Sequence, residues 1–192
     1  QELTIGFLRQ GSRRALVDVT NCPIATDTIN DALPQARENL QRTHRKKRGG
    51  TLLLREVIEG VVSDPKQLVS ERVGDLVFHF KAGEFFQNNP YILPKLVEYV
   101  ISQADADENS LLVDAYCGGG LFGLSAASRF QKVVGIEISR EGFEGARTNA
   151  QINRITNAQF YLGDASYIFE EIKNHAEGLG DGRRLSDAFS RA

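Results

Sequence analysis

The chain has 192 residues, of which 41% are hydrophobic, so it can form one large domain or two small ones with a buried core. Its formal net charge of −2 argues against attraction of nucleic acid to the whole surface, so such a contact needs a local basic segment. The two cysteines are too few for a disulfide framework, and no apolar run approaches the ~20 residues of a membrane span. We therefore expect an intracellular protein without a membrane partner, with the cytoplasm as default and the nucleus and mitochondrion left open.

The first part of the chain predicts an α+β region with an antiparallel sheet, which we place at residues 1–89. Apolar and polar residues alternate on both sides of a turn at 10–14, as in a hairpin. Thr26 or Asp27 can cap the next helix, in which Pro34 should cause a kink or an early end. Four strands are expected here besides that helix, at 3–9, 15–19, 51–56 and 60–62, and a fifth at 76–80.

From residue 90 onward, helical and strand patterns alternate, which is typical of βαβ units and a parallel sheet. We therefore expect an α/β fold here: an incomplete Rossmann-like sheet at residues 90–192, with strand order 3-2-1. The strands are expected at 111–115, 133–137 and 158–162, and the helices at 90–103, 121–129, 141–152 and 165–173.

A glycine-rich turn follows the first of these strands. Gly118, Gly120 and Gly123 satisfy G-x-G-x-x-G, which by itself fits an NAD-dependent oxidoreductase equally well. Asp114 favours a different cofactor, because a carboxylate would repel a pyrophosphate beside this turn. S-adenosylmethionine carries a sulfonium and no phosphate, so it tolerates a carboxylate there. A turn that only packs a helix on the sheet is the alternative.

Three further polar residues stand where a cofactor contact is expected. Glu137 ends the second strand and can accept hydrogen bonds from ribose hydroxyls, or can simply be solvated. Asp164 follows the third strand and can meet the adenine amino group, although capping of the next helix is favoured. Gln87 both donates and accepts, which suits a methionine carboxylate and ammonium; the alternative is a strand end followed by Asn caps.

Four segments together resemble the RNA (uracil-5-)-methyltransferase family, and most closely the eukaryotic tRNA enzymes. These segments are 85–89, 114–120, 135–137 and 149–153, and the resemblance covers about residues 1–173. It implies a class I methyltransferase domain that takes S-adenosylmethionine and acts on uracil carbon 5 in RNA, with tRNA as the expected partner. It also implies cofactor contacts by Gln87, Tyr116 and Glu137, with Asp164 as a further candidate.

The resemblance further implies that the reaction needs residues this chain does not contain. In the family, a Cys thiolate attacks uracil carbon 6, and this Cys, an Asp-Pro-Pro-Arg motif and a Glu base follow the matched region. The chain also lacks Met and opens on a strand-like run. We therefore expect a chain trimmed at both ends, with no catalytic residue and no methyl transfer of its own.

The two cysteines have structural roles in this interpretation. Cys117 lies in the cofactor turn and is expected to be a small buried packing residue. Cys22 matches a position that ligates an iron–sulfur cluster in some bacterial relatives, but such a cluster needs more cysteines than this chain has. We expect Cys22 to be a core thiol and the chain to bind no metal.

One basic segment could supply the local contact with RNA. Arg45, Lys46, Lys47 and Arg48 lie together without an acid between them, which suits contacts to phosphates. A solvated loop or a localisation signal is the alternative. A non-catalytic RNA-binding fragment is the remaining functional alternative.

Overall fold

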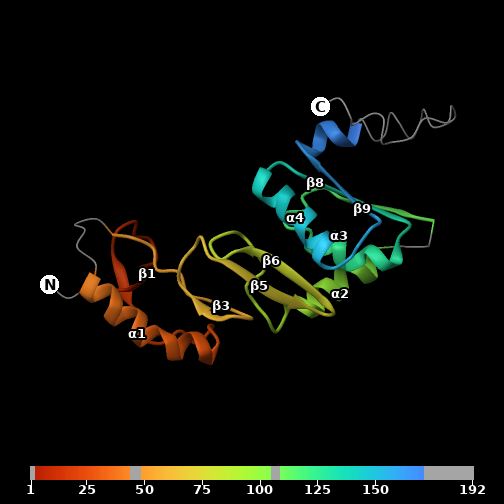
Figure 1. Cartoon of the computed structure of the whole chain (residues 1–192). Coiled ribbons are helices and arrows are strands. Elements are labelled where there is room, and N and C mark those ends of the chain that lie inside the picture. Colours follow the sequence, from red (N-terminus) through yellow and green to blue (C-terminus); the bar gives the residue numbers. More distant parts are fainter. Residues whose placement is uncertain (1–2, 44–48, 105–108, 171–192) are drawn as a thin grey trace. The chain divides into compact units, whose positions relative to one another are not determined.

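A computed structural model describes residues 3–43, 49–104 and 109–170 (Figure 1). The chain divides into two compact units, residues 1–70 with 81–84 and residues 71–80 with 85–192. The domain boundary expected at residue 89 stays a prediction. Within the described ranges, no helix is long and apolar enough to cross a membrane.

The first unit begins with the expected antiparallel hairpin. Strand β1 (Gly6–Leu8) pairs with β2 (Leu16–Asp18), with Phe7 opposite Val17. Both strands are exposed along their whole length, so apolar burial contributes little to holding them. The hairpin therefore depends on polar contacts from the helix that follows it.

Helix α1 (Asp27–Thr43) starts where the sequence predicts, because the Ile29 amide donates to the Thr26 hydroxyl at 3.3 Å. The expected early end at Pro34 is wrong, since α1 runs through it. Side chains on both sides of Pro34 hold the helix in place. Asn30 exchanges two hydrogen bonds with the backbone of Cys22, whose thiol is half-buried, and Arg37 binds the hairpin. An interior proline costs about 3 kcal/mol, and these contacts offset part of that cost.

Two further hairpins follow along the chain. Strands β3 (Arg55–Val57) and β4 (Gly60–Val62) pair antiparallel, so the strand expected from residue 51 starts only at Arg55. Strand β6 (Leu76–Lys81) was expected, but its partner β5 (Leu68–Val73) was missed. The missed signal is the Gly74-Asp75 turn between two apolar runs, where Gly74 has a φ of 59°.

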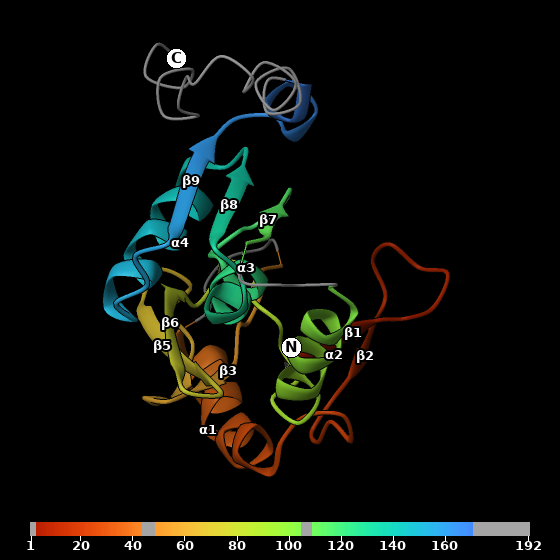
Figure 2. The same cartoon turned by 90° about the vertical axis from the view of Figure 1, so that its right-hand side faces the viewer.

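The second unit contains a parallel sheet in which β8 (Lys132–Glu137) lies between β7 (Leu111–Asp114) and β9 (Ala158–Leu162) (Figure 2). This confirms the predicted strand order and the place of 111–115 at an edge of the described sheet. The pairs Asp114–Gly135 and Glu137–Leu162 bring the carboxyl ends of the strands to one edge. Acidic strand ends that are separated in the sequence are therefore neighbours.

Helices and side chains cover both faces of this sheet. Helices α3 (Leu121–Ala126) and α4 (Arg140–Ile152) follow β7 and β8, and α2 (Leu93–Gln103) packs against α3. The expected helix 121–129 changes after Ala126 into a 3-10 turn, η1 (Ala127–Arg129). Each face has its own apolar cluster: Ala126, Ala127, Phe130 and Val133 on one, and Val134, Ile136, Ala165 and Ile168 on the other. The alternation of Val133 and Val134 between them is that of a central strand buried on both faces. This is an incomplete Rossmann-like α/β sheet, as the sequence predicts.

Arg37 connects α1 to the exposed hairpin. Its Nη1 donates to the carbonyl oxygens of Ile5 and Val19 at 2.9 and 2.8 Å, and its Nη2 to Asp18 Oδ2 at 2.9 Å. The Ile5 amide also donates to Asp18 Oδ1 at 2.9 Å. One guanidinium therefore binds the end of β2 and the residue before β1.

We predict that Arg37→Ala lowers the free energy of unfolding by about 1.5–3 kcal/mol, the range for hydrogen bonds to a charged group. Urea titration measures it, with Arg42→Ala as control, because among the described residues Arg42 donates only to Asn39 in its own helix. The Ile5 amide and then Arg37 hold the pKa of Asp18 below its usual value. Stabilisation by Asp18 is therefore present above the unfolded-state pKa and is lost as the pH falls through the lower folded-state pKa. In Arg37→Ala the free energy of unfolding should therefore fall less steeply as the pH is lowered. Equal losses of stability in Arg37→Ala and Arg42→Ala would contradict the prediction.

Candidate cofactor-binding site

The glycine turn lies at the carboxyl end of β7. Gly118 and Gly120 have φ angles of 50° and 88°, which favour glycine because a Cβ is strained there. The Gly120 amide donates to the Cys117 carbonyl at 2.7 Å, and the Cys117 amide donates to the Ile136 carbonyl of β8 at 3.0 Å. A Cβ added at Gly118 would meet no atom within 4 Å. The turn is therefore tied to the sheet on one side and faces open space on the other.

Asp114, at the end of β7, holds the start of α3. Its Oδ2 accepts from the Gly123 amide at 3.1 Å, which provides the side-chain cap that Gly120 lacks. A Cβ at Gly123 would make tight contacts, at 3.2 Å from Val133 Cγ1 and 3.3 Å from the same Asp114 oxygen. Burial raises the pKa of Asp114. Asp114 thus organises the turn from within, and a direct contact with the cofactor stays a prediction.

Glu137, at the end of β8, reaches the turn from the neighbouring strand. Its Oε2 accepts from the Gly118 amide at 2.9 Å and its Oε1 from the Ser139 amide at 2.7 Å. Gly142 leaves room for it, since a Cβ there would lie 2.9 Å from Glu137 Cγ. Two carboxylate oxygens can accept about four hydrogen bonds in total. Glu137 is half-buried, so its remaining acceptor positions can serve a ribose diol.

A third side chain holds the turn, and sequence reasoning missed it. Asn149 of α4 donates from Nδ2 to the Gly119 carbonyl at 2.9 Å. The segment 149–153 contributes to the family resemblance, but the sequence alone predicts no role for Asn149. The available signal was two asparagines one helical turn apart, Asn149 and Asn153, which lie on one helix face.

Tyr116 and Cys117 are neighbours in the turn with opposite surroundings. Tyr116 is 84% exposed, as a residue facing a ligand can be. Cys117 is 6% exposed, and a Cβ at Gly135 would lie 2.9 Å from its sulfur, so it packs against β8 as predicted. Burial, followed by the charges of Asp114 and Glu137, raises the pKa of the Cys117 thiol to about 12. This thiol is therefore not a nucleophile near neutral pH.

Gln87 belongs to the same compact unit as the turn and lies half-buried in the segment after β6. Its neighbour Phe86 is anchored, with its ring stacked on Phe80 at 4.3 Å and tilted against Phe78 at 5.8 Å. The position of Gln87 therefore depends on β6.

Asp164 acts as a helix cap, which was the favoured interpretation. Its Oδ1 accepts from the Ser166 hydroxyl at 2.6 Å and the Ser166 amide at 2.8 Å, at the start of the helical residues 165–170. The Ser166 hydroxyl and then its amide lower the pKa of Asp164. A contact between Asp164 and adenine stays a prediction. The basic segment of Arg45, Lys46, Lys47 and Arg48 lies outside the described residues.

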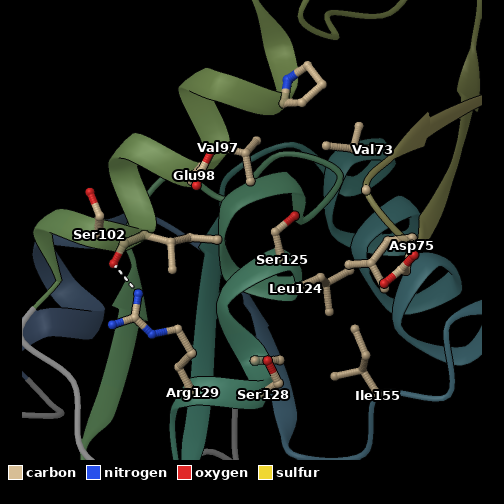
Figure 3. A pocket seen from close by; sticks show the side chains of 15 residues that line it. Val73, Asp75, Val97, Glu98, Ser102, Leu124, Ser125, Ser128, Arg129 and Ile155 are labelled. Carbon is tan, nitrogen blue, oxygen red and sulfur yellow. Dashed lines mark hydrogen bonds between the residues drawn. The ribbon is translucent and has the colours of Figure 1, made fainter.

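A pocket of about 610 Å³ lies elsewhere in the second unit, between α2, α3 with η1 and the β5–β6 turn (Figure 3). Val97, Leu124 and Ile155 line it, and Arg129 donates to the Ile101 carbonyl at 2.9 Å at its border. None of the residues that line it was predicted to bind a cofactor. Its lining does not include Gly118, Gly119 or Gly120.

The parallel sheet, its glycine turn and the carboxylates at its strand ends define a Rossmann-like domain of the S-adenosylmethionine-dependent methyltransferase type. A structure of the Pyrococcus abyssi tRNA (uracil-54, C5)-methyltransferase in complex with S-adenosyl-L-homocysteine shares this fold. Its TM-score is 0.66 at 24% identity, over 84% of this chain and 52% of that chain.

The family model for tRNA (uracil-5-)-methyltransferases matches residues 10–187, and the chain belongs to this family. It is 42% identical to the tRNA (uracil(54)-C(5))-methyltransferase of Schizosaccharomyces pombe, over 89% of this chain and 35% of the relative. It is 30% identical to the Saccharomyces cerevisiae enzyme of the same name, over 87% of this chain and 34% of the relative. The chain thus spans about a third of the length of these relatives.

We predict that Cys117 resists alkylation in the folded chain, because its thiol is buried and stays protonated at pH 8. Mass spectrometry after iodoacetamide treatment should find Cys22 modified and Cys117 unmodified until guanidinium unfolds the chain. The half-buried Cys22 is the internal comparison. Rapid modification of Cys117 under native conditions would show that the turn is open.

Proposed function

We propose that this chain binds S-adenosylmethionine at the glycine turn, as part of an enzyme that methylates carbon 5 of uracil in RNA, with tRNA as substrate. The observation that carries the proposal is Glu137, which is held by Gly118 beside a turn that faces open space. Family membership supports the reaction, and the names of the yeast relatives support tRNA.

The residues at the turn suit a cofactor without phosphate. Glu137 supplies acceptors for the ribose hydroxyls, the exposed Tyr116 ring can lie against the cofactor, and Gln87 can meet the methionine end. When bound, S-adenosylmethionine supplies the methyl group. The domain's task is to hold it at the edge of the sheet.

The structure also bears on the nucleophile of the reaction. Neutral uracil becomes reactive at carbon 5 only after a nucleophile has added to carbon 6, and a thiolate serves this purpose. The Cys117 thiol, with a pKa of about 12, is unsuited to the step. The nucleophile in this proposal is the Cys that the family carries beyond the matched region.

One contact argues against NAD as the cofactor. Helix amides at such a turn usually serve the pyrophosphate. Here the Gly123 amide, in the first turn of α3, is already bonded to the Asp114 carboxylate. Calorimetric titration of the chain with S-adenosylhomocysteine and with NAD tests the choice, and binding of NAD alone would reverse it.

We predict that Glu137→Ala weakens S-adenosylhomocysteine binding by about 1.5–3 kcal/mol, the value of hydrogen bonds to a charged group. Because Glu137 also holds the Gly118 amide, the ribose contact needs a separate test. 2′-Deoxy-S-adenosylhomocysteine should bind the wild-type chain more weakly than S-adenosylhomocysteine does. In Glu137→Ala the two ligands should bind almost equally, because the losses from two groups in contact are not additive. Equal losses in both chains would show that Glu137 does not contact the ribose.

We predict that neutralising Arg45, Lys46, Lys47 and Arg48 reduces tRNA affinity in a salt-dependent way. Each side chain that no longer neutralises a phosphate should lower the slope of log affinity against log salt by about 0.7–0.9. Lys81→Gln is the control, because Lys81 already pairs with Glu84 at 3.3 Å. If the slope does not change, the four side chains do not contact phosphates, and the segment is a solvated loop.

A further inference from the structure

Asn149 is a polar side chain in the core of the second unit, where it is 1% exposed. Its amide group makes three hydrogen bonds: Oδ1 accepts from the His79 amide at 2.7 Å, and Nδ2 donates to the His79 and Gly119 carbonyls at 3.3 and 2.9 Å. A buried amide that fills all these bonds is costly to replace, because each partner would lose its hydrogen bond. Its contacts therefore indicate a specific task.

Asn153, the residue that follows α4 as its C-terminal cap, makes the matching contact with β6. Its Oδ1 accepts from the Val77 amide at 2.9 Å, and its Nδ2 donates to the Val77 carbonyl at 2.7 Å. Residues 77 and 79 present their amide and carbonyl groups on the same edge of β6, since strand residues alternate. The two asparagines thus bind β6 as a neighbouring strand would, and α4 is fixed to that edge.

The two asparagines differ in their third contact. Asn153 Nδ2 donates within its own helix, to the Asn149 carbonyl at 2.8 Å, whereas Asn149 Nδ2 donates to Gly119. Gly119 lies between Gly118 and Gly120, the two glycines of positive φ. The Gly119–Gly120 peptide is held inside the turn by the Gly120 amide, which donates to the Cys117 carbonyl at 2.7 Å, and the bond from Asn149 ties the same peptide to α4.

Strand β6 also carries the segment before α2. Phe78 and Phe80 contact Phe86, the neighbour of Gln87. A continuous set of contacts therefore runs from Gly119 through Asn149 to β6, and from β6 through Phe86 to Gln87. These contacts connect the glycine turn with the Gln87 segment, the two places where the proposed function has the cofactor bind.

We propose that Asn149 is a positioning residue that holds the Gly119 carbonyl and strand β6 together, and so sets the glycine turn in register with the Gln87 segment for cofactor binding. The proposal rests on the proposed function for the nature of the ligand. Asn149 touches no reacting atom and acts through the turn. Its neutral amide suits a buried position where a carboxylate would lose its solvation.

The test compares Asn149→Ala with Asn153→Ala in the 192-residue chain. Each variant removes two hydrogen bonds to β6, so both should lower the thermal midpoint. Only Asn149→Ala should weaken S-adenosylhomocysteine binding, by about three- to ten-fold, the equivalent of one hydrogen bond. Equal losses of affinity in the two variants would overturn the proposal.

A second measurement needs no ligand. Hydrogen exchange followed by mass spectrometry should show faster exchange at 76–81 in both variants, and at 117–121 in Asn149→Ala alone. If the wild-type chain binds no S-adenosylhomocysteine, the proposed function fails while this comparison still tests Asn149. Unchanged exchange at 117–121 in Asn149→Ala would overturn the positioning role.

Asn149→Leu replaces Asn149→Ala if the latter does not fold. Leucine is close to asparagine in size and so avoids a cavity, and it removes the same hydrogen bonds, so the same results are expected. If neither variant folds while Asn153→Ala does, Asn149 has a purely structural role and the proposal is wrong.

Discussion

The site depends on three successive glycines, which have no side chains of their own to anchor them. They let the chain turn closely, and inside the turn the Gly120 amide donates to the Cys117 carbonyl at 2.7 Å. Side chains from three other elements anchor the turn. Glu137 of β8 holds the Gly118 amide, Asn149 of α4 holds the Gly119 carbonyl, and Asp114 of β7 holds the start of α3.

These contacts impose size limits on residues around the turn. Gly123 makes room for Asp114, Gly142 for Glu137, and Gly135 for the Cys117 sulfur and the Phe160 ring. A methyl group at Gly142 or Gly135 would come within 3 Å of these neighbours. Gly135 and Gly142, which lie outside the motif, therefore also contribute to the geometry of the turn.

Around the turn, charged side chains occupy half-buried positions and a neutral side chain occupies the fully buried one. The carboxylates of Asp114 and Glu137 lie at the half-buried carboxyl ends of the strands, where backbone amides meet them. In the fully buried position between α4 and β6 the sequence has a neutral amide, Asn149. An ion there would need compensation that backbone groups alone seldom supply. The carboxyl ends of β7 and β8 are thus acidic, while the position between α4 and β6 holds a neutral amide.

Local patterns in the sequence determined the alternation of strands and helices from β7 to β9, the glycine turn and the placement of Glu137 at a strand end. Each depends on residues close together in the chain, through hydrophobic periodicity and the backbone freedom of glycine. Tertiary structure alone decided the continuation of α1 through Pro34, because Arg37 binds residues as far back as Ile5. It also decided the role of Asn149, whose partner His79 is 70 residues away. A buried amide reveals its function only when folding brings its partners together, since no local pattern encodes a contact at that separation.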